Sequence, residues 1–291
     1  MPSVWSSAAW PIEPPFYGVL LTGALYWLGG RRRVSARRGL TRPAKTVSFY
    51  LGLLTVLVAL DSPLDPLSSK LFVAHMTQHI LLLTIAPVLI VFSAPWTQIW
   101  QPLPLGFRRT VAKAVVVDPR ARPLRAVAHA LGRPVVAWLV AAVTLLVWHV
   151  PALFDLTLRN QAAHDLEHAL FFFTGLLYWA RVIDSAPFRA PLGWLGRVVY
   201  TTTGMLVGWV LAVVLAFAPT PLYHAYAALP SRPGGLSALG DQQIAAGVMW
   251  VPGSIVYMVA LLIFFYRWLA PEPENRRAAV GGLLTPSIGG S

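Results

Sequence analysis

The sequence contains no cysteine among its 291 residues, and charged residues make up only 12% of it. The absence of cysteine excludes disulfide bonds, thiolate metal sites and thiol nucleophiles, so a bound metal would need His, Met, carboxylate or carbonyl ligands. The low share of charged residues excludes an ordinary soluble domain, in which about a quarter of the residues are charged. With 56% apolar residues and a mean hydropathy of +0.62, the chain has the composition of a membrane protein.

Seven apolar runs are candidates for membrane helices, each of which needs about 20 mostly apolar residues. They lie near residues 14–30, 46–61, 71–95, 134–154, 166–184, 195–218 and 243–269. We therefore expect an all-α, polytopic membrane protein with seven transmembrane helices in one domain over residues 1–270. The remaining segment, 271–291, is rich in Pro, Gly and Ser, which predicts a disordered cytoplasmic tail.

Acidic residues are also scarce, with 11 Asp and Glu against 23 Lys and Arg, and the basic residues are unevenly placed. Twenty of the 23 lie on one side of the predicted membrane, chiefly in the loops 31–45 and 96–133. Positive charge is retained in the cytoplasm, which predicts an external N-terminus and an internal C-terminus. We interpret the basic loops as topology signals that also contact anionic lipid, and we expect no nucleic acid partner. A short interfacial helix is expected at 124–131.

The histidines gather at the predicted outer face. Only His129 falls on the cytoplasmic side, and the other six lie at outer helix ends or in an outer loop: His75, His79, His149, His164, His168 and His224. Polar groups at membrane depth are costly and tend to mark function. The outer ends of the third, fourth and fifth predicted helices are therefore the expected functional site.

Spacing indicates what such a site would bind. Residues 75–79 and 164–168 both read H-x-x-[QE]-H at the start of an apolar helix. Residues four apart share a helix face, with Cβ atoms about 6 Å apart, so two imidazoles can hold one metal ion. The predicted metal ligands are His75, His79, His149, His164 and His168. Residues expected to support them, as a soft ligand or through hydrogen bonds to the rings, are Met76, Gln78, Asp61, Asp155, Glu167, His224 and Asp241.

The identity of the metal stays open at this point, since neutral imidazoles suit copper, zinc, iron and nickel alike. A site without thiolates suits a copper ion that must be released again. One alternative is a zinc peptidase, because His164-x-x-Glu167-His168 has the form H-x-x-E-H. Another alternative is haem held between axial histidines. In the 75–79 motif Gln78 replaces the glutamate and cannot act as a base, which favours a metal carrier over an enzyme.

Several separated motifs also carry a family resemblance. They are Ser62-Pro63-Leu64-Asp65, His75-Met76-Thr77-Gln78-His79, Trp148-His149-Val150-Pro151, His164-Asp165-Leu166-Glu167-His168 and Asp241-Gln242-Gln243. In this order they resemble the CtaG family of cytochrome c oxidase assembly factors over most of the chain. The resemblance implies a seven-helix protein of the bacterial plasma membrane that matures a haem-copper oxidase by delivering copper. It implies oxidase subunits or other copper chaperones as partners.

Overall fold

The computed structural model describes residues 14–31 and 41–270, and within them the regular secondary structure is helical. The only β-type pairing in that part of the chain is an isolated bridge between Ser185 and Phe188. The expected all-α class is therefore confirmed. The predicted disordered tail, 271–291, lies outside the described residues.

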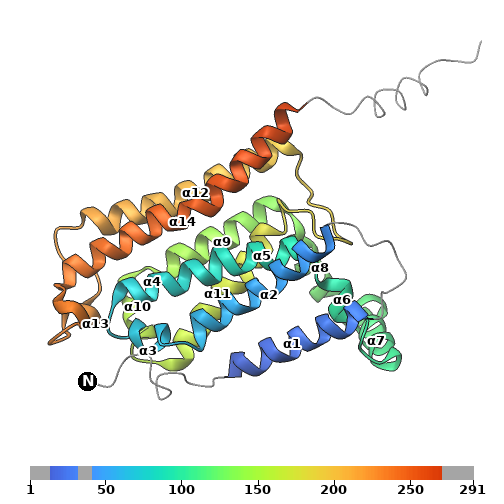
Figure 1. The fold of residues 1–291 in the computed structure, drawn as a ribbon, viewed down its shortest axis with the longest axis horizontal. Helices are drawn as coiled ribbons and strands as arrows, with labels where there is room; N and C mark the ends of the chain where they lie inside the picture. Colours follow the sequence, from blue (N-terminus) through green and yellow to red (C-terminus); the bar gives the residue numbers. More distant parts are fainter. Residues whose placement is uncertain (1–13, 32–40, 271–291) are drawn as a thin grey trace, which may run out of the picture.

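Each of the seven predicted apolar segments contains helix (Figure 1). The main helices are α1 (Pro14–Arg31), α2 (Thr41–Leu60), α4 (Phe72–Ile80) with the π-helical turn η2 (Leu81–Ile85) and α5 (Ala86–Ser93), α9 (Pro134–Trp148) with α10 (Pro151–Thr157), α11 (Gln161–Trp179), α12 (Trp194–Phe217) and α14 (Ala238–Leu269). Two of them begin earlier than predicted because a polar residue caps the first turn. The Asn160 side chain accepts from the N–H of Ala163 before α11, and the Ser237 side chain accepts from that of Gly240 before α14.

Fewer than seven of the described helices qualify as membrane spans by their length and apolarity alone. In the described residues, four helical segments are long and apolar enough to cross a membrane: Pro43–Leu60, Phe72–Ser93, Trp194–Phe217 and Ala238–Leu269. A fifth is obtained if Pro119–Gly132 and Pro134–Trp148, which meet at 86°, form one broken span. Helix α9 has only 15 residues, fewer than the about 20 that a crossing needs. Helix α11 carries several histidines and acids in its first half, which lowers its hydropathy.

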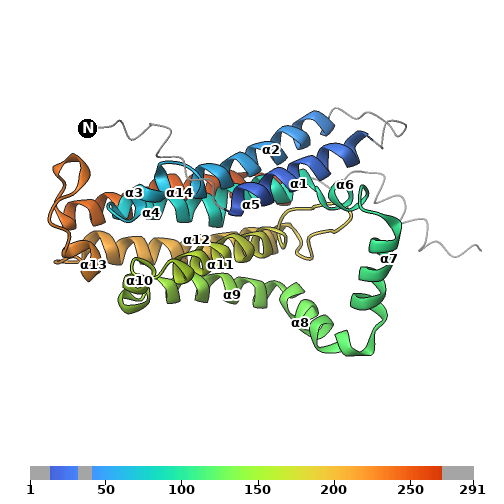
Figure 2. The same cartoon turned by 90° about the horizontal axis from the view of Figure 1, so that it is seen from below.

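The helices form an elongated bundle with different elements at its two ends. Helix α12 packs along α14, which also packs on α4, while α11 packs against α9, α5 and η2. The short helices α3 (Leu64–Ser68), α10 and α13 (His224–Ala227) lie at one end, and α6 (Trp96–Trp100), α7 (Leu105–Ala112) and α8 (Arg122–Gly132) lie at the other (Figures 1 and 2). The predicted histidine site belongs to the end that holds α3, α10 and α13.

Helix α8 confirms the short helix expected at 124–131. It projects from the bundle together with α7 and the turns η3 (Lys113–Val117) and η4 (Pro119–Ala121) (Figure 2). Leu124 and Val127 are 57% and 56% exposed, while the Arg125 guanidinium donates to the carbonyls of Val115 and Asp118. An exposed apolar stripe among arginines is typical of a helix that lies in the membrane interface.

The close crossing of α11 over the α4–η2–α5 segment depends on Gly175. Pro87 has no N–H, so the carbonyl of Leu83 lacks its usual partner four residues on, and the chain forms a π-helical turn there. A Cβ atom at Gly175 would collide with the Leu83 carbonyl oxygen and the Pro87 ring. The missing side chain therefore lets α11 lie directly against this segment. As a result, the first half of α11 sits beside the histidines of α4.

Candidate metal centre

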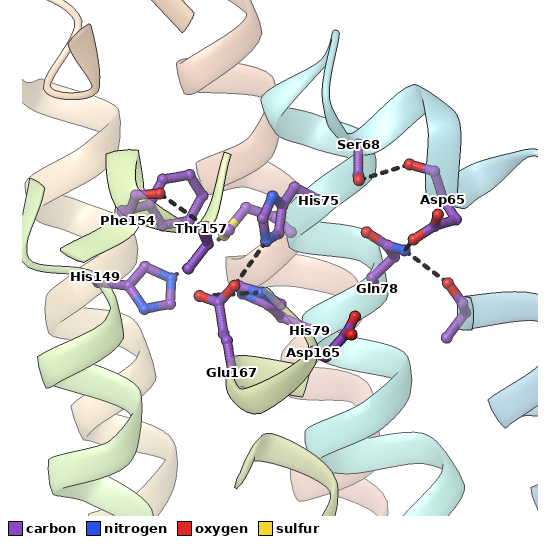
Figure 3. A network of polar contacts seen from close by, with 12 residues as sticks. Asp65, Ser68, His75, Gln78, His79, His149, Phe154, Thr157, Asp165 and Glu167 are labelled. Atoms are coloured by element: carbon purple, nitrogen blue, oxygen red, sulfur yellow. Dashed lines mark hydrogen bonds and ion pairs between the residues drawn. The ribbon is translucent and has the colours of Figure 1, made fainter. Parts of the chain in front are cut away.

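Four side chains from α4 and α11 bring metal-binding atoms together inside the bundle. His75 and His79 come from α4, and Glu167 and His168 come from α11. One donor atom from each lies within 4.8 Å of the donor atoms of the other three. All four residues are buried, His75 and Glu167 completely. We call this group the Glu167 cluster (Figure 3 shows three of its members).

Helix geometry and end caps place these residues. The four-residue spacing brings the rings of His75 and His79 to a centroid separation of 4.5 Å on one face of α4. The first turn of α4 is held by the Asp241 carboxylate, which accepts from the N–H groups of Phe72 at 2.7 Å and Val73 at 3.0 Å. A carboxylate is favourable at a helix N-terminus, where N–H groups lack helical partners. The cap therefore fixes the turn that carries His75.

The Glu167 carboxylate lies beside the two imidazoles of α4, on the side toward His149, as Figure 3 shows. Its Oε2 atom is 3.2 Å from Nε2 of His75, and its Oε1 atom is 3.6 Å from Nε2 of His79. A buried carboxylate is costly unless it is paired with a positive charge or coordinates a metal. The contact with the two rings therefore needs a proton or a cation.

The hydrogen bonds of His75 decide where its own proton lies. Tyr226 donates its hydroxyl hydrogen to the carbonyl of Ser68, so its oxygen acts as an acceptor toward Nδ1 of His75 at 3.2 Å. Nδ1 therefore bears the hydrogen of the neutral ring, and Nε2 presents a lone pair. That lone pair faces the Glu167 carboxylate, which is also an acceptor. Two acceptors at this distance repel each other unless a proton or a metal cation lies between or beside them.

Other potential metal-binding atoms of the cluster also lack hydrogen-bond partners. Both ring nitrogens of His79, Nε2 of His168 and Oε1 of Glu167 are buried and have no hydrogen-bond partner within the described part of the chain. Buried polar atoms are nearly always hydrogen-bonded, and leaving one unpaired costs about 1–3 kcal/mol. Three imidazoles and one carboxylate match the four ligands that a first-row metal ion takes. The residues present therefore fit a metal ion.

Two further predicted histidines flank the Glu167 cluster. The His164 ring lies 4.1 Å from that of His168 and 5.0 Å from that of His75. The His149 ring, at the C-terminal end of α9, lies 5.7 Å from that of His79. All five predicted metal ligands thus gather at one place, from three helices. His224, by contrast, is exposed at the start of α13 and is not a member of the Glu167 cluster.

Three of the expected supporting residues, Gln78, Asp155 and Asp241, form hydrogen bonds to groups other than the histidine rings. Asp155 and Asp241 were expected to bond to ring nitrogens, but Asp155 accepts from the backbone N–H of Ala225 and Asp241 caps α4. Both carboxylates accept hydrogen bonds from backbone N–H groups that have no partner within their own helix. Gln78 donates to the carbonyl of Ala59 and to Asp65, so it ties α4 to α2 and α3. Asp61 is buried just beyond the end of α2.

Tyr226 is a site residue that the sequence pattern does not reveal. It lies 151 positions from its partner His75, in a segment with no metal-binding motif. The only signal is its place in the same loop as His224, on the predicted outer side. Its neighbour Tyr223 donates to the carbonyl of His149 at 3.3 Å. The outer loop therefore supports both α4 and the end of α9.

Two cavities adjoin the cluster. A cavity of about 70 Å³ is lined by His79 and His149 together with Met205 and Met249. A cavity of about 660 Å³ lies among α1, α2 and α11, and His164 and His168 are part of its wall. The buried cluster thus has open space on two sides.

The chain was compared with known proteins and with protein-family models. The chain is 24% identical over 253 residues to uncharacterized proteins of Mycobacterium bovis and Mycobacterium tuberculosis, and 23% identical to one of Mycobacterium leprae. Each match covers 84% of this chain but only 36–37% of the relative, so the chain spans about a third of the length of these relatives. No solved structure matches the chain. The model of the cytochrome c oxidase caa3 assembly factor (Caa3_CtaG) family matches residues 24–270, and the chain belongs to this family.

Proposed function

We propose that the protein serves the assembly of a haem-copper cytochrome c oxidase by binding copper in the Glu167 cluster and passing it to an oxidase subunit or to another copper chaperone. Membership of the assembly-factor family supports the first part. The observation that carries the second part is the buried contact of His75 Nε2 with the Glu167 carboxylate at 3.2 Å, which needs a positive charge. A copper ion held by these residues would supply that positive charge.

The proposed topology has seven spans, with the N-terminus outside the bacterial plasma membrane and the C-terminus inside. The arginine-rich helices α7 and α8 then lie at the cytoplasmic interface, as the retention of positive charge requires. The Glu167 cluster belongs to the opposite end of the bundle, because His75 contacts Phe154 of α10 and Tyr226 of α13. Copper would therefore be held in the outer half of the membrane.

The geometry favours copper carriage over the two alternatives. A peptidase needs a glutamate that can activate water, but Glu167 is fully buried and contacts both His75 and His79. Haem between two axial histidines needs their rings on opposite faces of a wide macrocycle. The rings of His75, His79 and His168 are only 4.5–5.7 Å apart, which leaves no room for one between them.

The proposal is tested by the copper content of the purified full chain. Wild type and His75→Ala/His79→Ala are loaded with copper in detergent, freed of excess ion and analysed by elemental mass spectrometry. The matched control is His224→Ala, which removes an exposed histidine outside the cluster. We expect the double variant to lose about one copper per chain and the control to lose none. Equal copper in all three proteins would reject the proposed centre.

A companion measurement concerns the oxidase itself. Oxidase is purified from cells that produce either the wild-type chain or the double variant, and its copper content is determined. We expect less copper per oxidase with the variant. Full copper in the oxidase would show that the family role does not depend on this site.

A further inference from the structure

A second pair of possible metal ligands lies beside the Glu167 cluster and shares no atom with it. The Sδ atom of Met76 is 3.4 Å from Nε2 of His149. Met76 is fully buried and His149 is 6% exposed. Met76 lies on α4 next to His75, and His149 follows the last turn of α9, so the contact joins two helices.

This contact is not a hydrogen bond, because neither atom carries a hydrogen. Nδ1 of His149 lies 2.7 Å from the carbonyl oxygen of Leu145, to which it donates. A neutral imidazole has one N–H, so Nε2 of this ring presents a lone pair. A thioether sulfur has lone pairs and no hydrogen. Two lone-pair donors thus face each other in a buried place, the arrangement that a metal ion between them satisfies.

The distance suits a bridging ion. A metal bonded at about 2.0 Å to an imidazole nitrogen and about 2.3 Å to a sulfur spans the 3.4 Å gap at an angle of roughly 100°. Three- and four-coordinate ions accept such an angle. Further ligands of the same kind are near, because Met205 and Met249 line the cavity of about 70 Å³ that His149 also lines.

Ligand chemistry distinguishes this pair from the Glu167 cluster. No Asp or Glu lines the cavity beside His149, and the Glu167 carboxylate acts on this ring only from the neighbouring cluster. A buried cation without a counter-charge is costly, and the cost rises steeply with its charge. A thioether is moreover a soft ligand that selects Cu(I). The pair therefore suits a soft univalent ion, whereas the carboxylate of Glu167 suits a divalent one.

We propose that Met76 and His149 form a distinct site for Cu(I), completed by a methionine of the adjoining cavity. The inference rests on the proposed function, in which copper is the cargo. His79 lines the same cavity, and its ring lies 5.7 Å from that of His149, with both nitrogens buried and lacking hydrogen-bond partners in the described residues. It belongs to the Glu167 cluster and also reaches this cavity, so it gives an ion a ligand on the way from one site to the other.

The test uses two metal probes on the purified full chain in detergent. Ag⁺ replaces Cu(I), because it has the same charge and softness and does not change oxidation state, and Zn²⁺ probes the Glu167 cluster. Met76→Leu removes the sulfur while keeping a side chain of similar size. Met258→Leu is the matched control, since Met258 is 46% exposed on α14. We expect Met76→Leu to weaken Ag⁺ binding at least tenfold and to leave Zn²⁺ binding unchanged, with no effect of Met258→Leu.

X-ray absorption of Ag⁺-loaded wild type adds a measurement that needs no variant. We expect both sulfur and nitrogen neighbours of the silver ion. A spectrum without sulfur, or equal Ag⁺ affinity in wild type and Met76→Leu, would overturn the Cu(I) site. If wild type binds neither Zn²⁺ nor copper at the Glu167 cluster, the proposed function is overturned instead. The two failures are therefore distinguishable.

Discussion

His75 contacts two different oxygens through its two ring nitrogens, the Tyr226 hydroxyl through Nδ1 and the Glu167 carboxylate through Nε2, each at 3.2 Å. The tyrosine fixes the tautomer, and the tautomer decides which nitrogen is available to a metal. The same logic holds at His149, whose Nδ1 is bound by the Leu145 carbonyl and whose Nε2 faces Met76. In both rings a protein oxygen holds Nδ1, and Nε2 is presented to a possible ion.

Replacing Glu167 by Gln removes the negative charge while keeping the size of the side chain. We expect the affinity for divalent copper to fall at least tenfold, which corresponds to about 1.4 kcal/mol of binding free energy. Competition with a chromophoric chelator at pH 7.5 measures it. Asp165→Asn is the matched control, because Asp165 is an exposed carboxylate two positions away on α11. If both variants bind copper like wild type, Glu167 is not a ligand.

Tyr226→Phe tests the tautomer of His75. Without the hydroxyl, Nδ1 loses its acceptor, and the ring no longer has a fixed orientation toward the cluster. Loss of such outer partners lowers metal affinity about 10–100-fold, and we expect a decrease in that range in the same chelator assay. Tyr266→Phe, at a position that is 71% exposed, provides the control. A wild-type affinity in Tyr226→Phe would show that this hydrogen bond does not prepare the site.

The helices of this protein are largely predictable from its sequence, because apolar runs dominate it. Two of the missed boundaries lie where a capping residue extends a helix beyond its apolar run, as Asn160 does before α11 and Ser237 before α14. The number of qualifying spans differs from seven partly because the polar residues of the site lie within α11 itself. Hydropathy cannot distinguish such a helix from an interfacial one.

The site is predictable only in part. Four-residue spacing places His75 beside His79, and charge asymmetry assigns all five clustered histidines to one end. The partners across helices depend on tertiary packing that no local pattern encodes. Asp241, for example, caps α4 from 169 positions away, and Tyr226 contacts His75 from an outer loop.

Gly175→Ala tests whether the crossing of α11 over the α4–η2–α5 segment positions the cluster. The added methyl group would collide with the Leu83 carbonyl, so the helices must separate. Overpacking of this kind costs about 1–3 kcal/mol of folding stability, and we expect weaker copper binding as well. Gly247→Ala is the control, since a Cβ atom there meets nothing within 4 Å. Thermal unfolding and chelator competition are measured on both. Equal behaviour of the two variants would show that the crossing tolerates a larger spacing.

The contact of Asp184 with Arg197, near the loop between α11 and α12, should make the stability of the fold depend on pH independently of metal binding. Partial burial tends to raise the pKa of Asp184, but the hydrogen bonds from Arg197, at 3.1 and 3.3 Å, and from the Ala190 N–H outweigh it and hold the pKa below its usual value. A pKa that is lower in the folded than in the unfolded chain stabilises the fold at neutral pH, and this contribution is lost as the pH falls through the folded-state pKa.

Asp184→Asn tests this contribution. We expect the variant to unfold at a lower temperature than wild type at pH 7 and the difference to shrink as the pH falls toward 3. The effect is small, below about 1 kcal/mol, because the Asp184 side chain is 52% exposed and solvent screens the pair. Melting curves at several pH values in metal-free buffer measure it. A difference that stays constant with pH would mean that Asp184 acts through its shape or its backbone hydrogen bond, and that its charge contributes nothing.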